Sequence, residues 1–373
     1  MPASPEQAVR EEIAARAPAI AELTRDLIRI PTLNPPGALY RDICAFLAAR
    51  LAPRGFVTQM IRAEGAPGDS DAHPRWNLVA RREGGGPGPC VHFNGHTDVV
   101  EVGHGWTVPS FDGLIRDGRV YGRGACDMKG GLAAAIVAAE VFADHLPGHP
   151  GAIEISATAD EESGGYGGVA HLAEHGFFRP GRVDHVIIPE PLNKDRICLG
   201  HRGVWWAEVE TFGHIAHGAM PFLGDCAVAH MGAVLAQIDT HLKPALAARH
   251  TEMPVVPAAA RASTLNINSI HGGQAEMPPG ATGFPAPVVP DSCRMVIDRR
   301  FLIEETLDGV RGEFRDLMER VRADRPRMRY DIRDMHSVEP NMTDRAAPVA
   351  AALAGGIRQV LGSDADYVAS PGT

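Results

Sequence analysis

The sequence predicts an α/β fold in which a domain with a mixed sheet is interrupted by an inserted α+β domain. Up to residue 199, short apolar strands alternate with helices, which is typical of a mostly parallel or mixed sheet with helices on both faces. Near Gly200 the pattern becomes strand, helix, two strands, helix and strand, a split βαβ order. From Ala347 the first pattern returns. We therefore expect one domain of residues 1–199 and 335–373, and an inserted domain of residues 200–334.

The first domain is expected to begin with a helix. Ser4-Pro5-Glu6-Gln7 is typical of a capped helix start, and apolar residues then keep helical spacing until Pro31 ends the helix. The Ala-rich segment 129–146 is apolar on most sides, so we expect a buried helix there. The other expected elements are strands at 90–93, 152–158 and 183–188 and a helix at 168–175.

In the inserted domain, alternating apolar residues predict strands, and longer helical periods predict two helices. The expected strands are 204–211, 263–270, 293–301 and 328–332, and the expected helices are 226–242 and 304–321. Residues 254–290 contain seven prolines, so much of this stretch is expected to be a loop. After it, a helix at 347–361 and a strand at 367–369 complete the chain.

Composition excludes several functions. The chain carries 36 basic and 46 acidic residues, and this net charge of −10 argues against nucleic acid as a partner. Apolar runs stay far below the roughly 20 residues of a membrane span. The N-terminus does not resemble a signal peptide, and six scattered cysteines form no CxxC pair. We therefore expect a cytoplasmic protein with reduced thiols.

Chemistry concentrates where apolar strands end. FNGHTDVV contains His96 and Asp98, TADEESGG contains Glu161 and Glu162, and VIIPEP contains Glu190. In open α/β sheets ligands bind beyond the carboxyl ends of the strands, so these side chains are expected at one edge. A fourth motif, GRGACDMKGG with Asp127, leads into the Ala-rich helix.

Mixed imidazole and carboxylate ligands suit zinc or another divalent transition ion, and this many acids suit two ions bridged by a carboxylate. Alone, a HxD motif is more often a surface pair and an acidic triplet a solvated turn, so the combination carries the prediction. Asp98 would orient the His96 imidazole from two residues away. Glu161 and Glu162, on an extended segment, would point apart, one to metal and one to substrate as a general base.

These four motifs resemble the dinuclear-zinc peptidase and deacylase family, which includes acetylornithine deacetylase, succinyl-diaminopimelate desuccinylase, aminoacylase and carboxypeptidase G. The inserted domain shows the resemblance too, in GHIAHGAMP, SIHGGQ, VPDSC and IDRRF. The resemblance implies a mixed-sheet zinc-hydrolase catalytic domain and an α+β lid that is also a homodimer interface. It also implies two divalent metal ions, with zinc first and cobalt or manganese as alternatives.

The resemblance assigns roles to individual residues. It implies a cis peptide between Asp127 and Met128 and makes Glu161 the general base, with Asp98 behind His96 as a further catalytic residue. The implied metal ligands are His96, Asp127, Glu162 and Glu190, with Asp127 as the bridge. His217 resembles the lid histidine that stabilises the oxyanion, which the partner subunit can supply. The implied substrate-binding residues are Arg300, Arg202, Asn268, Gly372 and Thr373.

Two departures from the family pattern stand out. His201 occupies the place of the first arginine in the lid-entrance motif, which weakens assignment to the desuccinylase branch. The family also has a histidine ligand for the second metal beyond a Gly-Thr like that at 372–373, so we expect a truncated C-terminal part and a weak second site.

The predicted function is that of a metal-dependent amidohydrolase that removes the N-acyl group from an N-acyl amino acid. Glu161 would take a proton from the attacking water and return it to the amine. Glu190 favours the deacylase and carboxypeptidase branch, because aminopeptidases and dipeptidases of the family tend to have Asp there. The alternatives are a carboxypeptidase or dipeptidase of the same family, or a weakly active or non-catalytic binding form.

Overall fold

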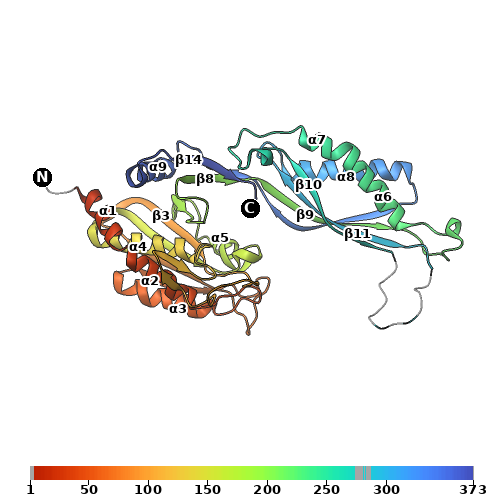
Figure 1. The fold of residues 1–373 in the computed structure, drawn as a ribbon. Helices are drawn as coiled ribbons and strands as arrows, with labels where there is room; N and C mark the ends of the chain where they lie inside the picture. Colours follow the sequence, from red (N-terminus) through yellow and green to blue (C-terminus); the bar gives the residue numbers. More distant parts are fainter. Residues whose placement is uncertain (1–3, 274–279, 281, 283–286, 373) are drawn as a thin grey trace. The chain divides into compact units, whose positions relative to one another are not determined.

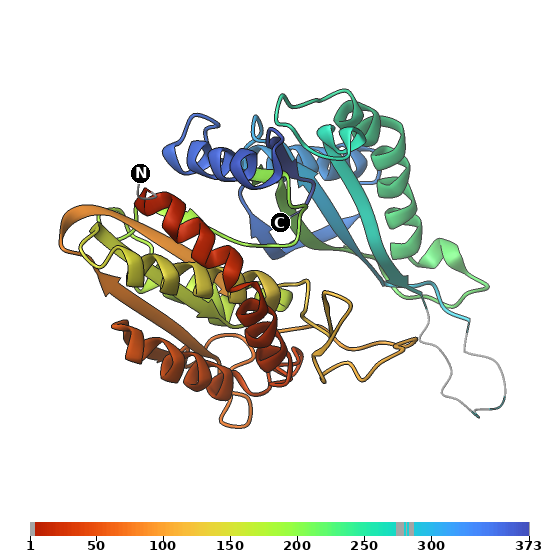
Figure 2. The same ribbon diagram turned by 60° about the vertical axis from the view of Figure 1, so that its left-hand side comes forward.

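The computed structural model describes residues 4–273, 280, 282 and 287–372. The chain divides into two compact units (Figures 1 and 2), Met1–Pro191 (unit 1) and Leu192–Thr373 (unit 2). Each unit has its own hydrophobic core. This division keeps 335–373 with unit 2, whereas the sequence assigned that segment to the first domain, and the domain boundaries stay a prediction. Among the described residues, no helix has the length and apolar character needed to cross a membrane.

Unit 1 is built on a mixed five-stranded sheet. Its order is β1-β2-β6-β3-β7, with β3 parallel to both β6 and β7 and antiparallel pairing at β1 and β2. The carboxyl ends of β6, β3 and β7 therefore lie at one edge. The main elements are α1 (Pro5–Ala15), α2 (Ala17–Ile28), α3 (Tyr40–Leu51), β1 (Val57–Arg62), β2 (Trp76–Glu83), β3 (Gly86–His96), β4 (Leu114–Arg116), β5 (Arg119–Tyr121), α4 (Lys129–His145), β6 (Pro150–Thr158), α5 (His171–Glu174) and β7 (His185–Ile187).

The two faces of the β3–β6 pair differ in chemistry. Apolar residues of β6 such as Ile153 and Ile155 pack against helices α2, α3 and α4 in the core of unit 1. The alternate residues are polar and buried: His92 Nδ1 lies 3.0 Å from Glu154 Oε1, and His92 Nε2 lies 2.7 Å from Ser156 Oγ. Because side chains alternate along a strand, His96 belongs to the same row as His92.

The expected single helix up to Pro31 is wrong. Ser4 does cap the start, accepting a hydrogen bond from the Gln7 backbone N–H at 3.2 Å. The helix then breaks at Arg16, which has φ −88° and ψ 10°, and α2 begins with a proline in its first turn. Pro18 has no N–H to continue the hydrogen-bond pattern of α1, so a new helix starts there.

Unit 2 contains the split βαβ arrangement that the sequence predicts. Its four-stranded antiparallel sheet has the order β10-β11-β9-β12. Both edge strands carry a register shift, β10 at Ile267/Ser269 and β12 at Asp334/His336. The elements are β8 (Arg196–His201), β9 (Gly203–Phe212), α6 (Ala227–Gln237), α7 (Lys243–Ala247), β10 (Thr264–Gly272), β11 (Ser292–Phe301), α8 (Leu307–Asp324), β12 (Arg329–Val338), β13 (Asn341–Met342), α9 (Pro348–Leu361) and β14 (Asp366–Ser370).

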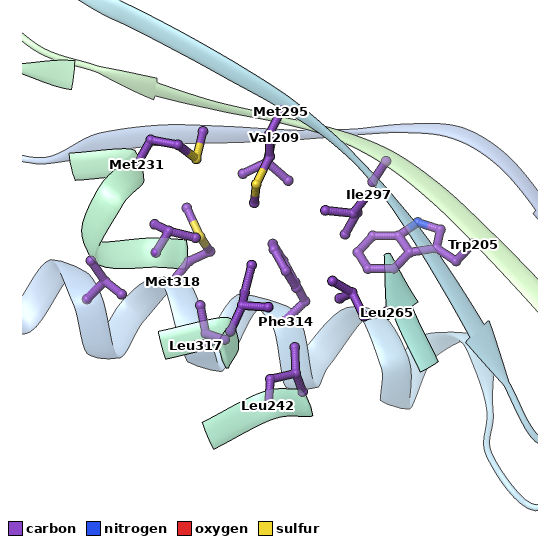
Figure 3. Packing of buried hydrophobic residues seen from close by; sticks show 14 of the residues in the cluster. Trp205, Val209, Met231, Leu242, Leu265, Met295, Ile297, Phe314, Leu317 and Met318 are labelled. Atoms are coloured by element: carbon purple, nitrogen blue, oxygen red, sulfur yellow. The ribbon is translucent and has the colours of Figure 1, made fainter. Parts of the chain in front are cut away.

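One face of this sheet packs on α6 and α8 through an apolar core. Figure 3 shows Phe314 of α8 among residues of the sheet such as Ile297 and Leu265. The Phe314 ring meets Trp205 of β9 edge-on, with 5.9 Å between centroids. A smaller sheet, β13-β8-β14, lies beside α9, and β14 runs parallel to β8.

Candidate metal centre

Three side chains from different elements converge at the carboxyl edge of the unit 1 sheet. His96 is the last residue of β3, Glu190 follows β7, and Asp127 precedes α4. His96 Nε2 lies 3.0 Å from Asp127 Oδ1 and 3.5 Å from Glu190 Oε1. One ligand atom from each residue fits within 4.8 Å of the others. The imidazole is buried, whereas both carboxylates reach solvent, so the group could bind a metal ion that arrives from solvent.

Main-chain geometry fixes the tautomer of His96. Its Nδ1 lies 3.0 Å from the main-chain carbonyl oxygen of Asp98, and 3.4 Å from Asp98 Oδ1. A carbonyl oxygen only accepts, so Nδ1 carries a proton, and Nε2 is the ring nitrogen that faces the acidic cluster, where a cation could replace a proton. The Asp98 carboxylate was expected to orient the ring, but the main-chain carbonyl of Asp98 makes the closer contact.

The Asp98 carboxylate instead holds the loop that follows β6. It accepts hydrogen bonds from the backbone N–H groups of Glu161 at 3.3 Å and Glu162 at 3.1 Å. The side-chain amide of Asn34 donates to the same carboxylate at 2.9 Å. Asp98 therefore joins the end of β3 to the acidic loop through several hydrogen bonds.

The acidic loop is not extended, so that expectation for Glu161 and Glu162 is wrong. Glu161–Ser163 form a short 3-10 turn, and Asp160 before it adopts φ +62° and ψ 17°. The left-handed region is uncommon for a residue with a side chain, and Asp is among the few types that tolerate it. Asp160, rather than strand alternation, sets the directions of the two glutamates.

Glu161 lies beside the cluster. Its Oε2 is 3.9 Å from His96 Nε2. Burial raises the pKa of the Glu161 carboxyl, and the negative charges of Asp98 and Asp127 add to this effect while His96 opposes it. A raised pKa suits a carboxylate that accepts and returns a proton. Glu162 is outside the group of three, but burial and the charge of Asp127 raise its pKa as well.

The electrostatics of the cluster match a site built for cations. Burial opposes protonation of His96, but the carboxylates of Asp127 and Asp98 outweigh it and raise its pKa to about 11. Burial, together with the charges of Asp127 and Glu161, raises the pKa of Glu190 to about 7. Crowded carboxylates around one imidazole form the donor set that a divalent ion would neutralise. The residues present therefore fit a metal.

The turn before α4 also matches the expectation. The Asp127–Met128 peptide is cis, which confirms the prediction from the resemblance. The Met128 sulfur accepts a hydrogen bond from the His96 backbone N–H at 3.1 Å. Lys129 is fully buried, and its Nζ donates to two main-chain carbonyls of the α2 end, those of Leu27 and Ile30. Burial lowers the pKa of Lys129 to about 7.

Asn34, Tyr40 and Arg75 lie well before the motifs, and no local pattern in the sequence marks them as part of the site. Arg75 Nε donates to Asp160 Oδ2 at 3.0 Å, and both side chains are buried. The Tyr40 hydroxyl donates to Asp160 Oδ1 at 3.1 Å. Arg75 is thus a cationic partner for Asp160, the first member of the acidic triplet.

The predicted lid residues lie in unit 2. His217 is exposed after β9, forms a bridge with Val288, and its Nδ1 accepts from the Ala219 N–H at 3.1 Å. Asn268 is exposed at the bulge of β10, and its Oδ1 accepts from the Asn266 side chain at 2.8 Å. Their roles stay predictions.

Arg202, Arg300 and Gly372 lie near one another within unit 2. Arg300 Nε donates to Asp298 Oδ1 at 2.7 Å. Arg202 is 6% exposed, and its guanidinium donates to the carbonyls of Pro371 and Ala262. These bonds fix the segment before Gly372. The substrate-binding role of Arg202 stays a prediction. Thr373 is outside the described residues.

Comparison with known proteins identifies the group to which this arrangement belongs. The model of peptidase family M20/M25/M40 matches residues 92–373. The chain belongs to this family. It is 33% identical over 367 residues to the succinyl-diaminopimelate desuccinylase of Marinobacter nauticus, covering 94% of this chain and 85% of that protein. The desuccinylase of Thioalkalivibrio sulfidiphilus is 30% identical over 366 residues, with the same coverage.

Solved structures show the same fold at lower identity. Human carnosine dipeptidase 1 gives a TM-score of 0.69 at 18% identity, covering 100% of this chain and 88% of that one. A Bacillus subtilis protein described as a dinuclear metal binding peptidase of the M20 family gives 0.65 at 13% identity, covering 96% and 84%. The predicted fold class and the predicted metal-dependent hydrolase activity on linear amide bonds, of the N-acyl amino acid deacylase kind, are confirmed.

Proposed function

We propose that this M20 enzyme removes the succinyl group from an N-succinyl amino acid of the diaminopimelate type. The observation that carries the proposal is the cluster of His96, Asp127 and Glu190 with Glu161 beside it, in a chain 33% identical to a desuccinylase over 94% of its length. The substrate is an amide with carboxylates on both sides. Such a substrate needs a general base, an electrophilic centre and a cationic side chain for a carboxylate.

Two divalent ions, zinc first and cobalt or manganese as alternatives, are proposed to occupy the centre. His96, Asp127 and Glu190 would hold one ion, and Asp127 with Glu162 would contribute to a second. The support is the donor set of imidazole and carboxylate oxygens together with the charge crowding that raises the pKa of Glu162 and Glu190. When bound, such ions act as Lewis acids that polarise a carbonyl and favour deprotonation of water.

The chain's own residues perform the proton transfers in this proposal. Glu161 takes a proton from the attacking water and returns it to the departing amine, for which its raised pKa is suited. Asp98 is the supporting catalytic residue: it keeps the His96 imidazole in one tautomer and fixes the Glu161 backbone N–H.

Unit 2 is proposed to supply the substrate contacts. Arg300 would bind a carboxylate with its planar guanidinium, and Asn268, Arg202, Gly372 and Thr373 would complete the pocket. His217 would stabilise the oxyanion, contributed within a homodimer formed through the lid (residues 200–334). Light scattering at several protein concentrations tests the dimer. Cell fractionation tests a cytoplasmic location, for which the six free cysteines are the support.

Assay of N-succinyl-L,L-diaminopimelate beside N-acetylornithine and a dipeptide, with zinc or cobalt added, tests the substrate. We expect the succinyl substrate to give the highest kcat/KM. Preference for the dipeptide would instead support the peptidase alternative, and no hydrolysis of any of them with metal bound would reject the deacylase proposal.

Glu161→Gln tests the general base. We expect turnover to fall by about 10²–10⁴-fold with metal content retained, because the amide is nearly isosteric and cannot accept the proton. Glu174→Gln is the matched control, because Glu174 is an exposed acid at the end of α5. Near-normal turnover of metal-loaded Glu161→Gln would reject the assignment.

A further inference from the structure

Three buried side chains contact one another at the start of the acidic loop that follows β6. Tyr40 from the start of α3, Arg75 from the residue before β2, and Asp160 after β6 meet in unit 1. Their exposed fractions are 1%, 4% and 2%. We refer to these three residues as the clamp.

The Tyr40 hydroxyl makes two hydrogen bonds to the same residue. It donates to Asp160 Oδ1 at 3.1 Å and accepts from the Asp160 backbone N–H at 3.1 Å. A hydroxyl has one proton to donate and can accept at its oxygen, so both bonds form together. Because one bond is to the main chain and the other to the side chain, Tyr40 fixes the orientation of Asp160 as a whole.

Arg75 holds the other carboxylate oxygen and is itself anchored. Its Nε donates to Asp160 Oδ2 at 3.0 Å, while Nη1 donates to the carbonyls of Pro36 and His73, each at 2.8 Å. The guanidinium plane also lies over the Tyr40 ring, 5.8 Å from its centroid. Arg75 and Tyr40, the cationic and the phenolic partner of Asp160, therefore also contact each other.

Gly167 packs closely against two members of the clamp. A Cβ at Gly167 would lie 2.5 Å from Asp160 Oδ2 and 2.5 Å from Arg75 Cγ. Only glycine permits this approach. Gly167, which follows the acidic turn, thus packs directly against the Asp160 carboxylate.

We propose that Tyr40 and Arg75 are positioning residues that hold Asp160 in its left-handed conformation and thereby aim Glu161 and Glu162 at the metal centre. Asp160 has φ +62°, and the 3-10 turn of Glu161–Ser163 starts directly after it. An ordinary φ at this residue would redirect the chain before both glutamates. The inference rests on the roles proposed for Glu161 and Glu162.

Tyr40→Phe tests the clamp because it removes only the hydroxyl. We expect kcat to fall about tenfold, as for the loss of a buried hydrogen bond, with KM changed less than about twofold. In the metal-free protein, hydrogen exchange of the peptide 158–165 should become at least about tenfold faster, because the Asp160 N–H loses its acceptor. Tyr330→Phe is the matched control, since its hydroxyl donates to the Glu319 carboxylate in unit 2.

A double-mutant cycle separates positioning from general destabilisation. In the Glu161→Gln background at saturating zinc, which offsets a weaker Glu162 ligand, Tyr40→Phe should lower turnover by less than about twofold, because Glu161, the other group that it positions, is already disabled. Multiplied losses would show that Tyr40 acts elsewhere and would overturn the inference. Unchanged hydrogen exchange of 158–165 in Tyr40→Phe would overturn it too.

Substitution of Asp160 gives a second route should Tyr40→Phe fold poorly. Asp160→Asn keeps a short polar side chain that tolerates positive φ, whereas Asp160→Ala keeps neither property. We expect Asn to retain at least about tenfold more turnover than Ala, and equal losses would contradict the proposal. Normal turnover of Glu161→Gln would reject the general base of the proposed function while leaving the hydrogen-exchange test of the clamp intact.

Discussion

The two main sheets differ in whether polar residues at their strand ends meet, and strand direction explains the difference. In unit 1, β6, β3 and β7 run parallel, so the residues after their carboxyl ends meet and form the cluster of His96 and Glu190 with Asp127. In unit 2 the four strands are antiparallel, so their ends alternate between two edges. Cross-strand polar pairs occur in both sheets, as between Arg333 and Glu208 at 2.9 Å in unit 2 and between His92 and Glu154 in unit 1, but antiparallel strand ends do not meet at one edge. A parallel arrangement gathers chemistry at one place, and an antiparallel one distributes it.

The largest expected effect is a loss of stability in unit 2 that leaves the metal centre intact. Phe314→Ala should destabilise the core of unit 2 by about 3–5 kcal/mol, because the ring is 2% exposed and leaves a cavity. Metal binding should persist, since the ligand cluster lies in unit 1. Urea unfolding with hydrogen exchange of β9 measures the first effect, and metal analysis the second. Val360→Ala, at a side chain 75% exposed, should change stability by less than about 0.5 kcal/mol.

The converse substitution weakens metal binding in unit 1 and leaves the stability of unit 2 unchanged. His96→Ala should weaken metal binding by more than about 100-fold, beyond what is lost on changing a residue behind a ligand. Chelator competition followed by metal analysis measures it. His175→Ala, an exposed histidine after α5, is the control. Equal metal retention in the two variants would mean that the parallel strand ends do not form the binding site.

A smaller effect concerns Glu305, a partly buried glutamate of unit 2. Burial opposes ionisation of Glu305, but hydrogen bonds from Ser263 and the charges of Arg299 and Arg249 outweigh it and lower its pKa. A depressed folded-state pKa gives stability that is present above the ordinary value of 4.5 and is lost as pH falls below it.

Glu305→Gln should therefore lower stability at pH 7 and flatten its decline below about pH 4.5, measured as urea midpoints across pH. Asp316→Asn, at an exposed position of α8, should leave the decline unchanged. A Glu305→Gln profile parallel to that of the original chain would show that this carboxylate does not contribute to acid sensitivity.

Features that depend on local pattern or on a motif could be predicted from the sequence. The presence of β3, β6 and β7 follows from apolar runs, although β3 continues to His96, beyond the expected end at 93. The cis bond at Asp127–Met128 follows from the family resemblance. The supporting contacts could not be predicted. Asp160 binds Tyr40 across 120 residues and Arg75 across 85, and no local periodicity encodes such a pairing.

The conformation of the acidic loop was mispredicted for the same reason. Strand alternation predicts opposite directions for Glu161 and Glu162, but Asp160 at positive φ ends the extended conformation before them. Its side-chain partners stabilise a backbone angle that intrinsic preference alone disfavours. A motif can thus identify the acids of a site without giving the geometry by which they act.

The bulges of unit 2 have a consequence for solution behaviour at high concentration. A sheet edge promotes fibre growth when it offers another strand a long, regular row of unpaired amide and carbonyl groups. Here both edges are interrupted, β10 between Ile267 and Ser269 and β12 between Asp334 and His336. Bulges twist an edge and end its regular pairing, so only short stretches can serve as a template. Irregularity at these two points thus disfavours edge-to-edge aggregation of this sheet.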